Sequence, residues 1–209
     1  MNKNLLIIFI YLFLTSGCTS STSLNKIDSN LTIDEFSMTQ FENNGDKLYS
    51  ISSPKCVFDK DKQIYKLNET EIFFYKKNYL NYVINSQQSS LLDNNKYIKL
   101  EGEVKLFDLN NKNNNIKANN AFWNIEKSEF LLEGNVILNN NSLNLISSKA
   151  ILNQKTKVIK FFRPVKYRYL NNSSKLNYQV SADNAFYNLD DKKLLFESEK
   201  ERIKSRLTF

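Results

Sequence analysis

The heptapeptide "ANNAFWN" at residues 118–124 returns almost unchanged as "ADNAFYN" at residues 182–188. The two copies are 182 − 118 = 64 residues apart. Near the midpoint, "SSKAILN" at residues 147–153 has the same outline of two small residues, a large apolar residue and Asn. A phrase that recurs about every 32 residues is typical of a supersecondary unit repeated along the chain.

Five copies of this phrase can be aligned on the small residue in its middle. Neighbouring copies lie between 150 − 121 = 29 and 185 − 150 = 35 residues apart. The aligned residues are Cys56, Ser89, Ala121, Ala150 and Ala185. A polar turn and a second apolar stretch follow each copy, and two of these stretches contain a Gly-x-Val step, at Gly102 and Gly134. Small residues and glycines at fixed places predict bends where two backbones approach closely.

The local period of the apolar residues distinguishes strands from helices. "VKYRYL" at residues 165–170 alternates apolar and basic side chains, and "YIKLEGEVKLF" at residues 97–107 alternates in the same way. Alternation with a period of two places one face in a core and the other in water, as in a β-strand. Five units of two strands predict an all-β domain of about ten strands.

Composition excludes several classes of enzyme. The sequence of 209 residues contains no His and only 4 Gly, and its formal net charge is +7. The commonest general base and zinc ligand is therefore missing, and the sequence contains no HExxH, GxSxG, P-loop or CxxC motif. The adjacent acids Asp190 and Asp191 fall in a predicted turn, where solvated carboxylates are expected. We therefore predict no catalytic residue, no metal and no cofactor.

The N-terminal segment has the features of an export signal. The apolar run from Leu5 to Leu14 follows Lys3 and is shorter than the roughly 20 residues that span a bilayer. Ser16 and Gly17 precede Cys18 as in a bacterial lipobox. We predict a signal peptide at residues 1–17, lipidation of Cys18, and a tether at residues 18–34. An uncleaved membrane anchor and a plain secretory signal remain alternatives.

The second cysteine, Cys56, occupies a small-residue position of the repeat. Because Cys18 is predicted to be lipidated, Cys56 has no partner for an intramolecular disulfide. We expect a buried, unreactive thiol, so the core alone must stabilise the fold.

The repeat resembles that of the organic-solvent-tolerance (OstA) family, which includes the lipopolysaccharide-transport proteins LptA and LptC. The resemblance rests on the phrase A-x-x-A-x-aromatic-N, the polar turn, and "FLLEGNV" at residues 130–136. A tethered single domain of this length is most similar to the LptC branch. The resemblance implies a twisted, partly open β-jellyroll of about five two-strand repeats at residues 35–200, followed by a C-terminal tail at residues 201–209.

The resemblance further implies a lipopolysaccharide carrier in the periplasm, tethered to the inner membrane rather than the outer one. Such a carrier takes lipid A from an inner-membrane ABC exporter and passes it to an LptA-like jellyroll by edge-strand addition. The implied lipid-groove residues are Leu100, Val104, Trp123, Leu132, Val136, Leu145, Phe161, Val165, Tyr167, Tyr178 and Val180. The implied partner edge comprises Leu194, Leu195, Phe196, Glu197 and Ser198.

Other interpretations of the same residues stay open at this point. In a β-protein, inward apolar residues usually form core, and Trp123 is better explained as a packing anchor than as a ligand contact. The chain could be an LptA-like bridge or an outer-membrane lipoprotein of the same pathway. It could also be a structural or adhesive surface protein without lipid cargo, or a lipid-processing enzyme. Nucleic acid is not an expected partner of an exported protein.

Overall fold

The computed structural model describes residues 30–109, 114–140, 143–170, 177–199 and 202–208. Within these ranges the chain forms β-strands and no helix. The strands are β1 (Asn30–Phe41), β2 (Lys47–Asp59), β3 (Ile64–Lys76), β4 (Tyr79–Leu92), β5 (Tyr97–Asp108), β6 (Asn115–Asn124), β7 (Glu129–Asn140), β8 (Leu143–Asn153), β9 (Val158–Phe162), β10 (Val165–Leu170), β11 (Asn177–Ala182), β12 (Asn184–Asn188), β13 (Leu194–Glu197) and β14 (Lys204–Thr208).

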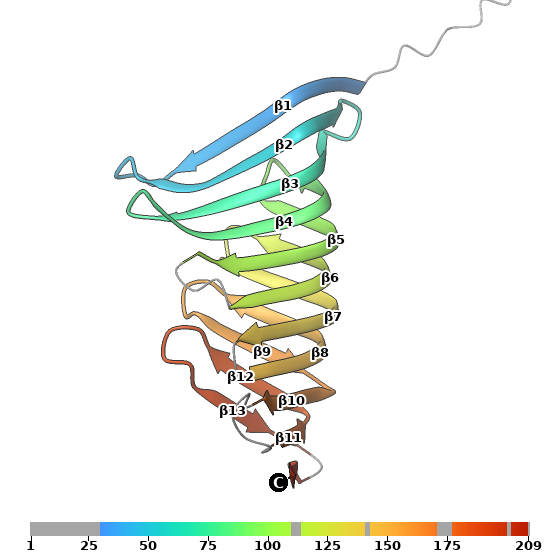
Figure 1. The fold of residues 1–209 in the computed structure, drawn as a ribbon. Helices are drawn as coiled ribbons and strands as arrows, with labels where there is room; N and C mark the ends of the chain where they lie inside the picture. The colour runs from blue at the N-terminus through green and yellow to red at the C-terminus, as the bar shows by residue number, and fades with distance from the viewer. Residues whose placement is uncertain (1–29, 110–113, 141–142, 171–176, 200–201, 209) are drawn as a thin grey trace, which may run out of the picture.

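All these strands belong to one antiparallel sheet, in which β1 to β8 pair in chain order (Figure 1). The sheet forks at β8, because the first part of β8 pairs with β10 and the second part pairs with β9. One branch continues from β10 through β11 to β14, and the other from β9 through β12 to β13. Each branch ends in a strand that pairs on one side only.

The long strands bend at a common line, which we call the crease. The pairing of β4 to β8 is interrupted at the same level in each strand, for example between Glu101 and Val104 and between Glu133 and Val136. After β8 in the chain, the strands are shorter, and each lies on one side of this line. Pro164 stands between β9 and β10, where its missing N–H prevents ladder pairing. The crease thus divides the sheet into two walls.

The first wall contains β10, β11, β14 and the halves of β1 to β8 that adjoin the β1–β2, β3–β4, β5–β6 and β7–β8 turns. The second wall contains β9, β12, β13 and the other halves of β1 to β8. Inward residues form rows across neighbouring strands, such as Ile72, Ile84 and Leu106 in the first wall. All three are buried, while the residues next to each of them along its strand face outward. The alternation therefore turns both apolar faces toward each other.

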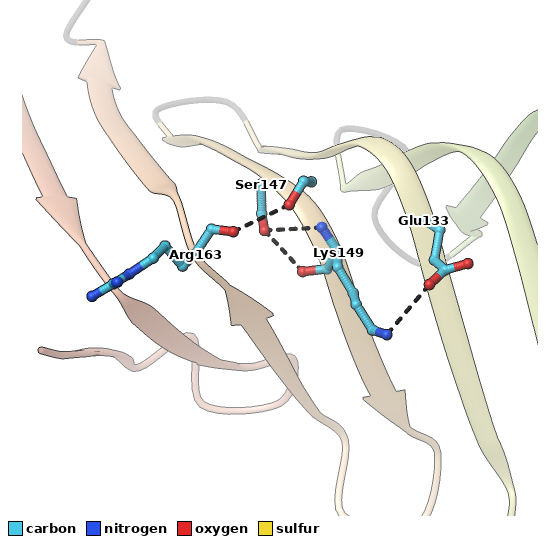
Figure 2. Close-up of polar contacts among 5 residues, drawn as sticks. Glu133, Ser147, Lys149 and Arg163 are labelled. Carbon is cyan, nitrogen blue, oxygen red and sulfur yellow. Dashed lines mark hydrogen bonds and ion pairs between the residues drawn. The ribbon is translucent and has the colours of Figure 1, made fainter. Parts of the chain in front are cut away.

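Serine hydroxyls supply hydrogen bonds at the crease. Ser53, Ser86 and Ser147 are equivalent in the repeat, and each hydroxyl contacts the carbonyl oxygen two residues ahead, at 2.8, 3.1 and 2.8 Å. The Ser147 hydroxyl also contacts the carbonyl of Phe162 in β9. Figure 2 shows this hydroxyl against the backbone of Lys149, with the Lys149–Glu133 ion pair on the outer surface. The serine hydroxyls thus form hydrogen bonds with buried backbone groups that the bend removes from strand pairing.

Glycine at the crease leaves room for a side chain of the neighbouring strand. Gly102 and Gly134 have φ values of +74° and +75°, in the left-handed region. A Cβ at Gly134 would lie 2.8 Å from Nδ2 and 3.0 Å from Cβ of Asn119 in β6. Gly102 faces Gln87 of β4 in the same way. The recurring Gly-x-Val step is therefore a packing requirement between neighbouring copies of the repeat.

Aromatic side chains join the two walls through the interior. Trp123 in the second wall contacts Tyr49 and Phe74 in the first wall, with ring centroids 4.9 and 5.0 Å apart. Near the C-terminal end, Tyr167 of β10 meets Phe196 of β13 at 5.4 Å. Such edge-to-face pairs stabilise a core beyond the area they bury. Cys56 is buried in this core as a free thiol, and desolvation raises its pKa.

The architecture agrees with the expected all-β, partly open jellyroll, with three differences. The sheet has fourteen strands rather than about ten, mainly because three strands are each divided at the crease. It begins at Asn30, before the expected start at residue 35. It continues to Thr208, because Lys204–Thr208 pairs with β11, so the expected tail at 201–209 contains a strand. The predicted signal and Cys18 lie outside the described residues.

The crease predicts a specific cost for a side chain at Gly134. Gly134→Ala combines left-handed strain with the clash against Asn119, and we expect a loss of about 2–4 kcal/mol in unfolding free energy. Gly45→Ala is the control, because Gly45 also has a positive φ, +86°, but a Cβ added there would meet no atom within 4 Å. Urea unfolding of both variants measures the difference. Equal losses would show that the close approach at the crease contributes nothing.

Candidate functional site

The predicted groove residues lie on the inner faces of the walls, but they do not line an open channel. Nine of the eleven are at most 4% exposed, and Tyr167 and Tyr178 are half-buried. The void beside Val104 and Leu132 has a volume of about 10 Å³. The interior is therefore filled by its own side chains, and lipid contact by these eleven residues stays a prediction. Trp123 packs between the walls as an anchor.

The space available to a ligand lies at the seam, the line opposite the crease where the turns of the two walls face each other. A cavity of about 300 Å³ opens there. Its floor is apolar and comes from both walls, and its rim carries amides and lysines. The lining residues are Leu48, Phe74, Tyr75, Lys76, Asn81, Tyr82, Leu106, Ser128, Phe130, Leu152, Gln154, Lys155, Lys157 and Leu189.

The volume and chemistry of this seam cavity suit part of an amphiphile. Ligand pockets in proteins have volumes of about 300–1,000 Å³ and a mostly apolar lining. The seam cavity is at the lower end, large enough for a segment of acyl chain but not for a lipid with several chains. A larger hollow of about 480 Å³ lies outside the crease, where Glu35, Glu69 and Glu71 would repel an anionic lipid.

Contacts across the seam are few and weak. The Lys157 ammonium lies 3.4 Å from the Tyr82 hydroxyl and 4.8 Å from the ring centroid, and joins the β8–β9 turn to β4. Asn140 donates to the Tyr187 hydroxyl at 3.5 Å. These contacts are long or involve a neutral partner and are individually weak, whereas at the crease the covalent backbone of β1 to β8 runs from one wall into the other. The seam is therefore the side on which the walls can separate.

Burial perturbs four tyrosines that face the interior or the seam. Desolvation raises the pKa values of Tyr49, Tyr82, Tyr167 and Tyr187. For Tyr82, the negative charges of Asp108 and Asp190 act in the same direction. Each phenol is thus kept in its neutral form, which can contact an apolar chain without the cost of burying a charge.

The predicted partner edge coincides with β13, which pairs only with β12. Leu195 points outward and is 59% exposed, whereas Leu194 and Phe196 pack against the core. Ser198 lies just beyond the strand, and its hydroxyl accepts a hydrogen bond from the Asp183 backbone at 3.4 Å. The structure also has a second edge strand near the C-terminus, β14, which lies in the segment that the sequence predicts to be a tail.

Sequence reasoning missed most of the seam cavity. Lys155 and Lys157 belong to the polar turn "NQKTK", which we interpreted only as a turn. Tyr82 lies 75 residues away from Lys157 along the chain. The recurring polar turns were a signal that turn residues gather on one side, but only the registers show which turns meet.

Among the described residues, no helical segment has the length and apolarity to traverse a bilayer. In the same part of the chain, no three His, Cys, Asp or Glu side chains converge as ligands of a metal ion would.

Comparison with known proteins gives one finding. A family described as "Lipopolysaccharide-assembly, LptC-related" matches residues 5–170. The match begins in the apolar N-terminal run and extends through the end of β10, and therefore covers most of the chain. No curated protein matches the sequence significantly.

The four tyrosines with raised pKa values predict loss of stability in alkali. In the unfolded chain a tyrosine ionises near its ordinary pKa of 10.0. Because the folded pKa values are raised, the stabilisation is complete below pH 10.0 and is lost as pH rises through the folded values. Circular dichroism against pH will show unfolding above this point. Tyr49→Phe should shift the transition upward, and Tyr79→Phe, at an 81% exposed side chain, should not. Equal shifts would refute the role of burial.

Proposed function

The chain belongs to the family of LptC-related lipopolysaccharide-assembly proteins, and from this premise we propose that it is a membrane-tethered carrier of lipopolysaccharide in the periplasm. The observation that supports this most is the pair of apolar walls joined at a crease and only weakly held at a seam with an apolar cavity. The carrier is not an enzyme. It binds the acyl chains of lipid A and leaves the sugars in water.

Acyl chains enter between the walls from the seam. Each methylene removed from water contributes about 0.8 kcal/mol, and the inner faces offer Leu, Ile, Val and aromatic side chains from every strand. Entry separates wall-to-wall contacts such as Phe74–Phe130, so lipid contacts replace protein contacts of similar area. The loaded and the empty carrier then differ little in free energy, as reversible binding of a cargo requires. ATP is used by the exporter.

The free strand edges give the carrier a direction. Within the described residues, β1 pairs on one side only at the N-terminal end, and β13 and β14 each pair on one side only at the other end (Figure 1). We place the inner-membrane ABC exporter at β1, because residues 1–29, with the apolar run and Cys18, precede that strand. The LptA-like jellyroll joins at β13 and β14. Strand addition satisfies unpaired backbone groups that otherwise promote aggregation.

Photo-crosslinking in cells tests the carrier function. A photoreactive phenylalanine analogue at Phe161 or Tyr167, on inner faces, should form adducts with lipopolysaccharide during transport. The control is Phe162, which follows Phe161 on the opposite face of β9. We expect at least roughly tenfold less adduct there, because outward residues face water or partners. Absence of adduct at both inner positions in folded protein would reject the groove.

A second crosslinking experiment tests the direction of transport. Leu31 of β1 and Leu195 of β13 are both exposed apolar residues on free edge strands, at 50% and 59% exposure. A probe at Leu31 should capture the exporter, and a probe at Leu195 should capture the LptA-like bridge. Ile146, 40% exposed on the internal strand β8, is the control and should capture neither. Capture of the LptA-like bridge at Leu31 and of the exporter at Leu195 would contradict the proposed direction of transport.

A further inference from the structure

Three lysines line the seam cavity, which has an apolar floor. Some lysines of the outer surface pair with carboxylates along the strands, as in Lys99–Glu101 at 2.7 Å and Lys149–Glu133 at 3.3 Å. Lys76, Lys155 and Lys157 all line the cavity, and within the described ranges none of them forms an ion pair with a carboxylate. The acids nearest to this region, Asp108 and Asp190, act on Tyr82.

The three ammonium groups come from both sides of the seam. Lys76 ends β3 in the first wall, and Lys155 and Lys157 belong to the β8–β9 turn of the second wall. Lys157 is half-buried, and its present partner is the neutral phenol of Tyr82. A charged phosphate is a stronger acceptor for an ammonium group than a phenol is. Ammonium groups that form no direct ion pair with a described carboxylate, above an apolar floor, are suited to an anionic head and an apolar tail.

We propose that the seam cavity is a recognition site for a phosphorylated acyl lipid, in which Lys155, Lys157 and Lys76 bind the phosphate and the apolar floor binds the first part of a chain. This rests on the proposed lipid-carrier function and adds the headgroup that is selected. Selection occurs at the side of the jellyroll, where the lipid enters, and precedes full insertion between the walls.

Phosphate binding at this place also weakens the seam. The Lys157 ammonium leaves Tyr82 when it binds phosphate, which removes one of the few links between the walls. The Lys157 carbonyl accepts the backbone N–H of Leu189 at 2.9 Å, so the β8–β9 and β12–β13 turns remain joined. The second wall therefore stays intact while it separates from β4. The same ligand that is recognised thus opens the route to the interior.

The native tryptophan provides a reporter for the cavity. Trp123 is the only tryptophan in the sequence. Its Nε1 donates to the Gln154 side chain at 3.0 Å, and its ring stacks on Phe130 at 5.1 Å. Gln154 and Phe130 both line the seam cavity. A ligand that fills the cavity changes the surroundings of Trp123 and hence its fluorescence.

The test measures Trp123 fluorescence of the full chain in detergent against three probes: lipid A with both phosphates, the same lipid A without phosphates, and inorganic phosphate. We expect the phosphorylated lipid to bind about tenfold more tightly than the dephosphorylated one. Lys155→Gln/Lys157→Gln should remove this preference and leave affinity for the dephosphorylated lipid unchanged. Inorganic phosphate alone should not alter the signal.

The matched control is Lys60→Gln/Lys62→Gln, because these lysines have the same spacing in the equivalent β2–β3 turn of the second wall, away from the cavity. It should retain the preference for phosphate. Equal affinities for the two lipids, or an equal loss in the control, would overturn the recognition site. If inorganic phosphate alone bound tightly and this binding required Lys155 and Lys157, the lysines would form a site for a free anion. That result would also overturn the lipid-recognition site. Failure of both lipids to bind would instead reject the proposed carrier function.

Discussion

The bend that every long strand makes at the crease, with glycine backbone packed against a neighbouring side chain, is the constraint on which this molecule depends. A sheet this wide can bury its apolar face only if it folds on itself, and every strand must then bend at the same level. Gly134 against Asn119 and the Ser147 hydroxyl between two strands show how the bend is accommodated. The repeat of about 32 residues exists because each pair of strands must supply the same devices at the same height.

Because the chain crosses the crease but not the seam, our proposal assigns stability and cargo binding to the same inner surface. The inner faces form a packed core, and aromatic pairs such as Tyr49–Trp123 and Tyr167–Phe196 join the walls where no backbone does. Under the proposed carrier function, lipid contacts replace such side-chain contacts, whereas the covalent backbone of β1 to β8 continues to join the walls at the crease. The fold would then persist while the walls separate at the seam.

The fork at β8 affects how such a domain joins others. A simple stack would end in one edge strand, but here each wall ends in its own edge, β13 or β14. A partner jellyroll with the same crease can extend both walls, so the apolar interior continues across the junction. The N-terminal end has one long strand, β1, which runs across the crease and serves both walls. The two ends are thus different surfaces, as a one-way transfer requires.

Sequence alone determined the strands, the repeat, the small residues of the crease and the all-β jellyroll, because alternation and glycine positions act over a few residues. It also identified the inner faces, since Leu100 and Val104 are buried as the alternation of residues 97–107 predicts. The family resemblance supplied the function class. Only the tertiary structure decided that these faces pack together, that the space lies at the seam, and that Lys157 meets Tyr82. Those features depend on the angle of the crease and the registers of many strands, which no local pattern encodes.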